Sequence, residues 1–141
     1  MNKQLYIALY LFLLLSVKTN AQFITIPDPN FVTWLNNHGY ASCISANQMD
    51  TTCTPVVNAV GVDCRNSNIN DLTGISYFDN LDTLICQENQ LTTLPALPIG
   101  LRYLYCAYNS ITVLPALNDS LNRLACSYNQ LTNLPSLPDS L

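Results

Sequence analysis

Six cysteines are the residues of this sequence with the most chemistry to offer: Cys43, Cys53, Cys64, Cys86, Cys106 and Cys126. Six cysteines could form three disulfides in an oxidising compartment, and cysteine thiolates could also hold a metal ion. No two of them form a C-x-x-C pair, and no histidine lies near the last four in the sequence, so we expect no metal site. Their spacing divides them into two groups that need separate explanations.

Side chains for catalysis are scarce. The chain has one glutamate, and its single histidine, His38, belongs to no recognisable motif with a serine, a cysteine or an acid. The four glycines do not cluster, which excludes a glycine-rich loop for phosphate. We therefore expect a protein that is not an enzyme and that uses no cofactor and no metal.

The charge balance restricts the partners of this protein. Charged residues make up 10% of the 141 residues, against about 25% in an average soluble domain. Beyond residue 21 there is no lysine, and three arginines are set against nine acidic residues, a net charge of −6. These numbers exclude a long acidic tail and a nucleic-acid binder with a basic patch, and the length allows one domain at most.

The first 21 residues have the layout of a secretory signal peptide. A positively charged start, MNKQ, is followed by an apolar run of 13 residues from Leu5 to Val17 and by the small residue Ala21. The run is shorter than the roughly 20 residues that a membrane-spanning helix needs, although an uncleaved anchor remains the alternative. No later stretch is apolar enough to span a membrane. We expect cleavage after Ala21 and a mature protein that is secreted or held at the cell surface.

A repeat of 20 residues organises the second half of the chain. Three segments align without gaps: LDTLICQENQLTTLPALPIG (81–100), LRYLYCAYNSITVLPALNDS (101–120) and LNRLACSYNQLTNLPSLPDS (121–140). They share the frame L-x-x-L-x-C-x-x-N-x-[LI]-x-x-L-P, and a looser copy begins at residue 59. Leu141 is the first residue of a further repeat, so we expect a C-terminally truncated array.

This frame resembles that of leucine-rich-repeat proteins, and the 20-residue unit with Leu-Pro-x-Leu-Pro resembles their bacterial class. Residues 70–81 resemble the longer repeat that often opens secreted bacterial examples, and residues 26–31 resemble their N-terminal segment. The resemblance implies a β-solenoid with a curved parallel sheet of short strands. It divides the mature chain into a cap (22–58) and about four repeats (59–141), and says little about a ligand.

The repeat frame has a physical interpretation of its own. Leu84 and Cys86 are two residues apart, as on one face of a strand, and each strand would pair in parallel with the next at about 4.8 Å. An asparagine three residues after each cysteine (Asn89, Asn109, Asn129) can satisfy backbone groups at the bend. The Leu-Pro pairs disfavour helix, so we expect an extended or polyproline-like convex side.

Residues 22–58 are expected to cover the open end of the first repeat. Asp28-Pro29 is typical of a helix start, and Gly39 suits a helix end, which predicts a short helix over about 29–38. Phe31, Trp34 and Leu35 would form its apolar face. The polar segment 40–58 is expected to be irregular.

The two groups of cysteines follow from this organisation. Cys64, Cys86, Cys106 and Cys126 occupy the same inward frame position, where we expect four buried free thiols; disulfides between neighbouring repeats are the alternative. Cys43 and Cys53 lie outside the frame, ten residues apart, and we expect them to form a disulfide.

The outward positions of the strands hold the candidate binding residues. All three arginines and four tyrosines occur there or on the adjoining flank, and tyrosine and arginine are enriched at binding hot spots. The full set is Arg65, Ile85, Gln87, Glu88, Arg102, Tyr103, Tyr105, Tyr108, Arg123 and Tyr128. The opposing interpretation is that aromatic residues merely suit a β surface.

From these features we expect a secreted binding module whose concave sheet recognises a protein or an extracellular polymer. The alternatives are a structural spacer or surface element, or the recognition part of a longer protein whose effector or anchoring domain is missing. Whether the outward tyrosines and arginines are needed to bind a partner distinguishes a binding module from a structural spacer.

Overall fold

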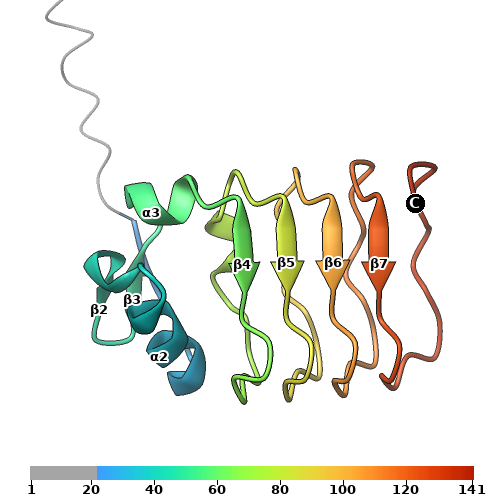
Figure 1. The fold of residues 1–141 in the computed structure, drawn as a ribbon, viewed down its shortest axis with the longest axis horizontal. Coiled ribbons are helices and arrows are strands. Elements are labelled where there is room, and N and C mark those ends of the chain that lie inside the picture. The colour runs from blue at the N-terminus through green and yellow to red at the C-terminus, as the bar shows by residue number, and fades with distance from the viewer. Residues whose placement is uncertain (1–21) are drawn as a thin grey trace, which may run out of the picture.

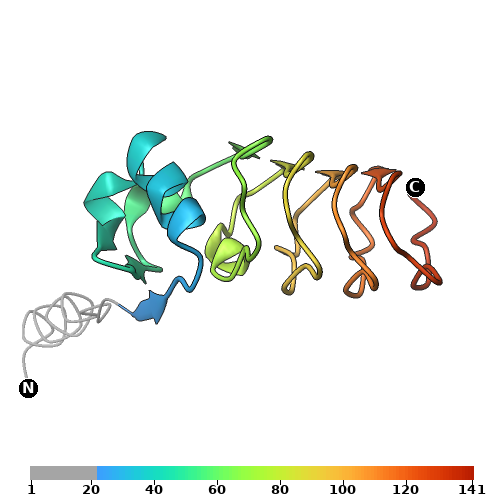
Figure 2. The same ribbon diagram turned by 90° about the horizontal axis from the view of Figure 1, so that it is seen from below.

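The computed structural model describes residues 22–141, and the signal peptide predicted at 1–21 lies outside the described residues. A mixed N-terminal part precedes a row of stacked coils (Figures 1 and 2). The N-terminal part contains β1 (Phe23–Thr25), α2 (Pro29–Asn37), β2 (Ile44–Ser45), β3 (Gln48–Asp50) and α3 (Thr54–Val57). The coils carry β4 (Gly61–Asp63), β5 (Thr83–Ile85), β6 (Tyr103–Tyr105) and β7 (Arg123–Ala125). None of the helices within 22–141 has the length and apolarity to cross a bilayer.

The four strands of the coils form one parallel sheet in the order β4-β5-β6-β7 (Figure 1). Its register places Val62, Leu84, Leu104 and Leu124 in one row, as the repeat frame predicts. Each strand has only three residues, so the return path of every coil is mostly irregular. The prediction of a parallel sheet of short strands is confirmed.

The interior of the stack is built from the repeated leucines. Leu84, Leu91 and Leu104 are fully buried between neighbouring coils, and each such side chain contributes roughly 1.5–3 kcal/mol when it leaves water. Leu124, in the same row, is only half-buried. The reason is that β7 has a neighbouring strand on one side only among the described strands.

The side opposite the sheet is extended, as the Leu-Pro pairs predict. Between residues 81 and 141 the chain forms no helix, and its backbone there runs through bends, turns and one isolated bridge between Thr93 and Val113. The looser first copy differs, because it contains a 3₁₀ helix at Ile75–Tyr77.

The asparagine of each repeat connects two coils. The Asn109 carboxamide oxygen accepts from the Leu91 N–H at 3.0 Å, while its NH₂ group donates to the carbonyls of Cys86 and Cys106 at 3.0 and 3.1 Å. Asn89 and Asn129 make the corresponding bonds. The predicted role of these residues at the bend is confirmed: each pairs backbone groups that the three-residue strands do not reach.

Helix α2 begins and ends as the sequence predicts. The Asp28 carboxylate accepts from the N–H groups of Asn30 and Phe31 at 2.7 and 3.3 Å, and Gly39 after the helix has a φ of +93°. The other oxygen of the buried Asp28 accepts from the backbone N–H groups of Asn70 and Asp71. One carboxylate therefore both starts the helix and fastens it to the first coil.

The expectation of an irregular segment over 40–58 is wrong. This segment contains β2 and β3, a 3₁₀ helix at Ala41–Cys43, and α3, and β3 is the central strand of an antiparallel sheet of order β1-β3-β2. The strands have two or three residues, too few to show an alternating pattern. The pairing of β1 with β3 also joins residues more than 20 positions apart, such as Phe23 and Asp50, which no local pattern reveals.

Candidate binding surface

The outward side of the sheet, which we call the strand face, consists of the exposed side chains of β4–β7 and of the residues directly after each strand. On β6, Tyr103 and Tyr105 point outward and are half-buried, whereas Leu104 between them is fully buried. The register aligns Thr83 with Tyr103 and Arg123, and Ile85 with Tyr105. The structure thus places these predicted residues on one side of the sheet.

The last position of the strand face has an unusual backbone conformation. Asn66, Glu88, Tyr108 and Tyr128 have φ values of +51°, +55°, +55° and +55°, in the left-handed region. Asparagine is suited to this region, but for other non-glycine residues it costs energy. Sequence analysis predicted the outward position of Glu88, Tyr108 and Tyr128 but missed their backbone conformation. The asparagine at the same position of the first coil, Asn66, was the available signal.

Tyr108 and Tyr128 form an exposed aromatic pair at this position. Their ring centroids are 4.4 Å apart and their planes differ by 9°. The two residues remain 52% and 71% exposed, so the pair is a platform on the surface rather than part of the core. Since neighbouring coils set the spacing, the rings are aligned before any partner binds.

The three arginines are held in different ways. Arg65 forms an ion pair with Asp63 at 2.6 Å, and Arg102 pairs with Asp82. In each case the hydrogen bond from the arginine lowers the pKa of the carboxyl group. The guanidinium of Arg123 lies over the Tyr105 ring at 5.8 Å from its centroid and is in no ion pair with a described acidic residue.

The predicted binding residues do not form a single cluster. Arg65 follows β4, whereas Arg123 and Tyr128 belong to the β7 coil, three strand spacings or about 14 Å away. Gln87 and Glu88 lie between them, after β5. The strand face therefore has a charged end at β4–β5 and an aromatic end with a free arginine at β6–β7.

Five of the six cysteines are either disulfide-bonded or buried. Cys43 and Cys53 form a disulfide with a Cα–Cα distance of 5.5 Å, and the four cysteines of the repeats are free. Burial raises the pKa of Cys64 and of Cys106 to about 12, and that of Cys86 upward as well, which keeps these thiols protonated and unreactive. Cys126 departs from the expectation of four buried thiols, because it lies directly after β7, the last described strand, and is half-buried. No three histidine, cysteine or acidic side chains gather into a possible metal site among residues 22–141.

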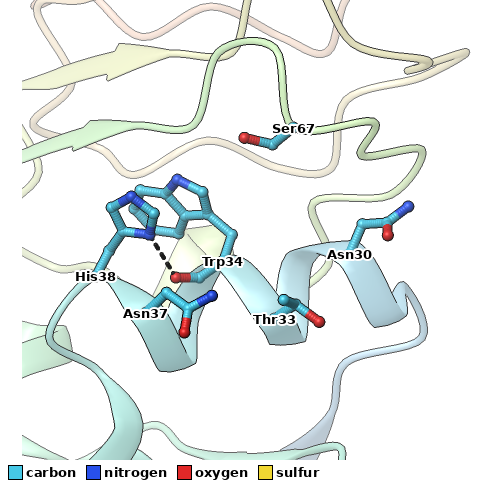
Figure 3. A pocket seen from close by; sticks show the side chains of 6 residues that line it. All are labelled: Asn30, Thr33, Trp34, Asn37, His38 and Ser67. Carbon is cyan, nitrogen blue, oxygen red and sulfur yellow. Dashed lines mark hydrogen bonds between the residues drawn. The ribbon is translucent and has the colours of Figure 1, made fainter.

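A groove beside helix α2 was also missed by sequence analysis. It lies between the helix and the loop after β4 (Figure 3). Its lining includes Trp34, which was expected on the apolar face of the helix, and His38, which was expected to have no catalytic role. The i, i+4 spacing of these two residues was the available signal.

Comparison with known proteins agrees with the repeat pattern. No protein-family model matches the chain. Over 70 residues, 46% of the chain, it is 36% identical to Internalin J of Listeria monocytogenes serotype 4b (strain F2365), and the match spans 8% of that protein. A solved Shigella effector LRR domain superposes with a TM-score of 0.58 at 36% identity, covering 62% of this chain and 40% of the other. These likenesses support a leucine-rich-repeat protein with a solenoid-like fold.

Proposed function

We propose that this protein is a non-enzymatic recognition module that binds a protein partner through the strand face. The observation that carries the proposal is the Tyr108–Tyr128 pair, which is exposed, stacked and placed on backbone that favours asparagine or glycine. Residues held in costly conformations cluster at functional sites. Tyrosine at two successive left-handed positions has no role in the core, so binding is the better explanation of its presence.

The arginines support the same function. Arg123 has no acidic partner on the described chain and lies against Tyr105, so it is available to a carboxylate of the partner. Arginine flanked by tyrosine is typical of the centre of a protein interface. The chain is similar in sequence to Internalin J and in structure to a Shigella effector LRR domain, and likeness to leucine-rich-repeat proteins favours recognition over a purely structural spacer.

The mechanism of binding is recognition by a surface formed before the partner arrives. The strands are fixed by the sheet, and the bends after them by the asparagine bonds between coils, so few backbone groups become ordered on binding. Tyrosine side chains also lose little conformational entropy for the area that they bury. We further propose that the protein acts outside the cytoplasm, secreted or at the cell surface, because of the signal-peptide layout of residues 1–21.

Affinity capture with matched variants tests this function. Wild-type protein, the Tyr108→Ala/Tyr128→Ala variant and the Thr112→Ala/Thr132→Ala variant are immobilised and exposed to extracellular proteins. The two threonines are exposed and lie beyond the bend of the same two coils, so their replacement preserves the strand face. We expect proteins that bind the wild type and the threonine variant but not the tyrosine variant. Equal capture by all three would favour the spacer function.

A further inference from the structure

The groove beside α2 shares no lining residue with the strand face and has a volume of about 210 Å³ (Figure 3). Asn30, Thr33, Trp34 and Asn37 line it from one face of the helix, since they are spaced three or four residues apart. His38 closes the end of this wall, and Ser67, in the loop after β4, lines the opposite side.

The groove walls are fixed relative to each other. The Asn30 side chain donates to the Asn68 carbonyl across the junction at 2.8 Å, close to the point where Asp28 accepts from the first coil. Trp34 is held by aromatic contacts with Phe31 and Tyr40. A ligand would therefore enter a site that is already shaped.

The groove offers several hydrogen-bonding groups that the rest of the chain leaves unused. The Asn37 carboxamide has no bond to any described residue, and Asn30 uses only its NH₂ group. The hydroxyls of Thr33 and Ser67 donate to backbone carbonyls at 2.8 and 3.1 Å and keep their lone pairs available as acceptors. No aspartate, glutamate, lysine or arginine is among the lining residues.

The aromatic part of the groove is a stacked indole and imidazole. The rings of Trp34 and His38 lie 4.4 Å apart and within 8° of parallel, and the His38 Nδ1 is 2.7 Å from the Trp34 carbonyl oxygen. The indole N–H of Trp34 makes no hydrogen bond to a described residue. Every buried side-chain nitrogen of the described residues has a hydrogen-bond partner, so this unpaired N–H must be open to solvent. Figure 3 shows the nitrogen edge of the indole turned toward the loop that holds Ser67.

We propose that this groove binds one neutral sugar ring. A sugar presents several hydroxyls, each both donor and acceptor, which match neutral carboxamide and hydroxyl groups, and the exposed His38 ring can cover an apolar C–H face. A charged ligand would find no fixed opposite charge in the lining. The volume is below the roughly 300–1,000 Å³ of sites for drug-sized ligands and suits a ligand of one ring. This proposal does not depend on the function of the strand face.

The chain contains a single tryptophan, which makes the site observable without a label. The indole ¹H–¹⁵N signal of Trp34 is followed while glucose, galactose, mannose or N-acetylglucosamine is added to the purified protein. We expect one of these sugars to shift the signal saturably with a roughly millimolar Kd, and acyclic sorbitol to leave it unchanged. The natural ligand could be the end of a glycan or a free sugar, and the methyl glycoside of the bound sugar distinguishes the two. It binds as well as the free sugar in the first case and more weakly in the second.

Two asparagine variants on the same helix complete the test. Asn37→Ala removes the unused carboxamide and should weaken sugar binding by roughly 2- to 10-fold, the effect of one hydrogen bond. Asn36→Ala is the matched control, because Asn36 lies outside the groove and donates to the Val32 carbonyl; its Kd should equal that of the wild type. An indole signal that no sugar moves, or equal Kd values for Asn37→Ala and wild type, would overturn the proposal.

Discussion

Tyr108 and Tyr128 occupy the same position of consecutive coils, with parallel rings 4.4 Å apart and φ values of +55°. The separation of the rings is close to the spacing of the strands beneath them, about 4.8 Å. The sheet therefore sets the geometry of the pair. The pair forms because two successive coils carry a tyrosine three residues after the end of the strand.

The asparagine bonds should be the most sensitive polar element of the fold. Asn109→Ala leaves the Leu91 N–H without its partner, whereas the carbonyls of Cys86 and Cys106 keep their bonds from Asn89 and Asn129. We expect a loss of about 1–3 kcal/mol in the free energy of unfolding, the cost of one unpaired buried group. Urea denaturation followed by circular dichroism measures this loss. The control is Asn122→Ala, an exposed asparagine of the next repeat, for which we expect less than about 0.5 kcal/mol.

The left-handed position can be tested at Glu88. Glu88→Asn places there the residue that the first coil already has at Asn66, and asparagine adopts positive φ at lower cost. We expect unfolding to require about 0.5 kcal/mol more than in the wild type, a fraction of the 1–2 kcal/mol of the full conformational penalty. Gln90→Asn, two residues along on backbone without positive φ, should bring no gain. Destabilisation by Glu88→Asn would show that the positive φ of Glu88 does not lower the stability of the wild type.

The buried thiols predict a loss of stability in alkali. Burial raises the folded-state pKa of Cys64 and Cys106 to about 12, while an unfolded thiol ionises near pH 8.5. The free energy of unfolding therefore has its full value below about pH 8.5 and falls as the pH rises further, because the unfolded chain releases its thiol protons first. The slope is up to about 1.4 kcal/mol per pH unit for each thiol. Urea midpoints between pH 8 and 10 measure this slope. A Cys64→Ala/Cys106→Ala variant should flatten it, and an unchanged slope would exclude the thiols as its cause.

Thiol reactivity should follow the same burial. In the folded protein we expect a thiol reagent to modify Cys126 first, since Cys64, Cys86 and Cys106 are buried. In denaturant all four free cysteines should react at similar rates. Peptide mapping after timed modification identifies the order; early modification of Cys86 would contradict the packing of the stack.

The disulfide should stabilise the N-terminal part. Cys43→Ala/Cys53→Ala opens a loop of ten residues, for which restriction of the unfolded chain contributes about 2–3 kcal/mol. We expect a comparable loss in the wild type under reducing conditions. The reductant should have no further effect on the double variant, which separates the disulfide from other effects of the reducing agent.

The periodic part of the fold could be predicted from the sequence alone. Identical spacing of Leu84, Leu104 and Leu124 determines strand register, because every coil must present the same residues to its neighbours. The start of α2 could likewise be predicted from Asp28 and Pro29, since helix capping depends on residues that are adjacent in the sequence.

The parts that could not be predicted depend on contacts between distant residues. The sheet of β1, β2 and β3 joins segments that are each too short to show a pattern. The second oxygen of Asp28 reaches residues 70 and 71, more than 40 positions away. At the candidate surface, outward positions followed from the repeat, but the placement of Arg123 over Tyr105 depends on which coils are neighbours and on rotamers.

The affinity of the strand face for a captured partner tests the central claim most directly. Isothermal titration calorimetry compares wild type with Tyr108→Ala/Tyr128→Ala, whose unfolding is measured in parallel. Two hot-spot tyrosines worth about 1 kcal/mol or more each predict a Kd at least roughly 30-fold higher for the variant. An unchanged Kd in a folded variant would contradict recognition through this surface.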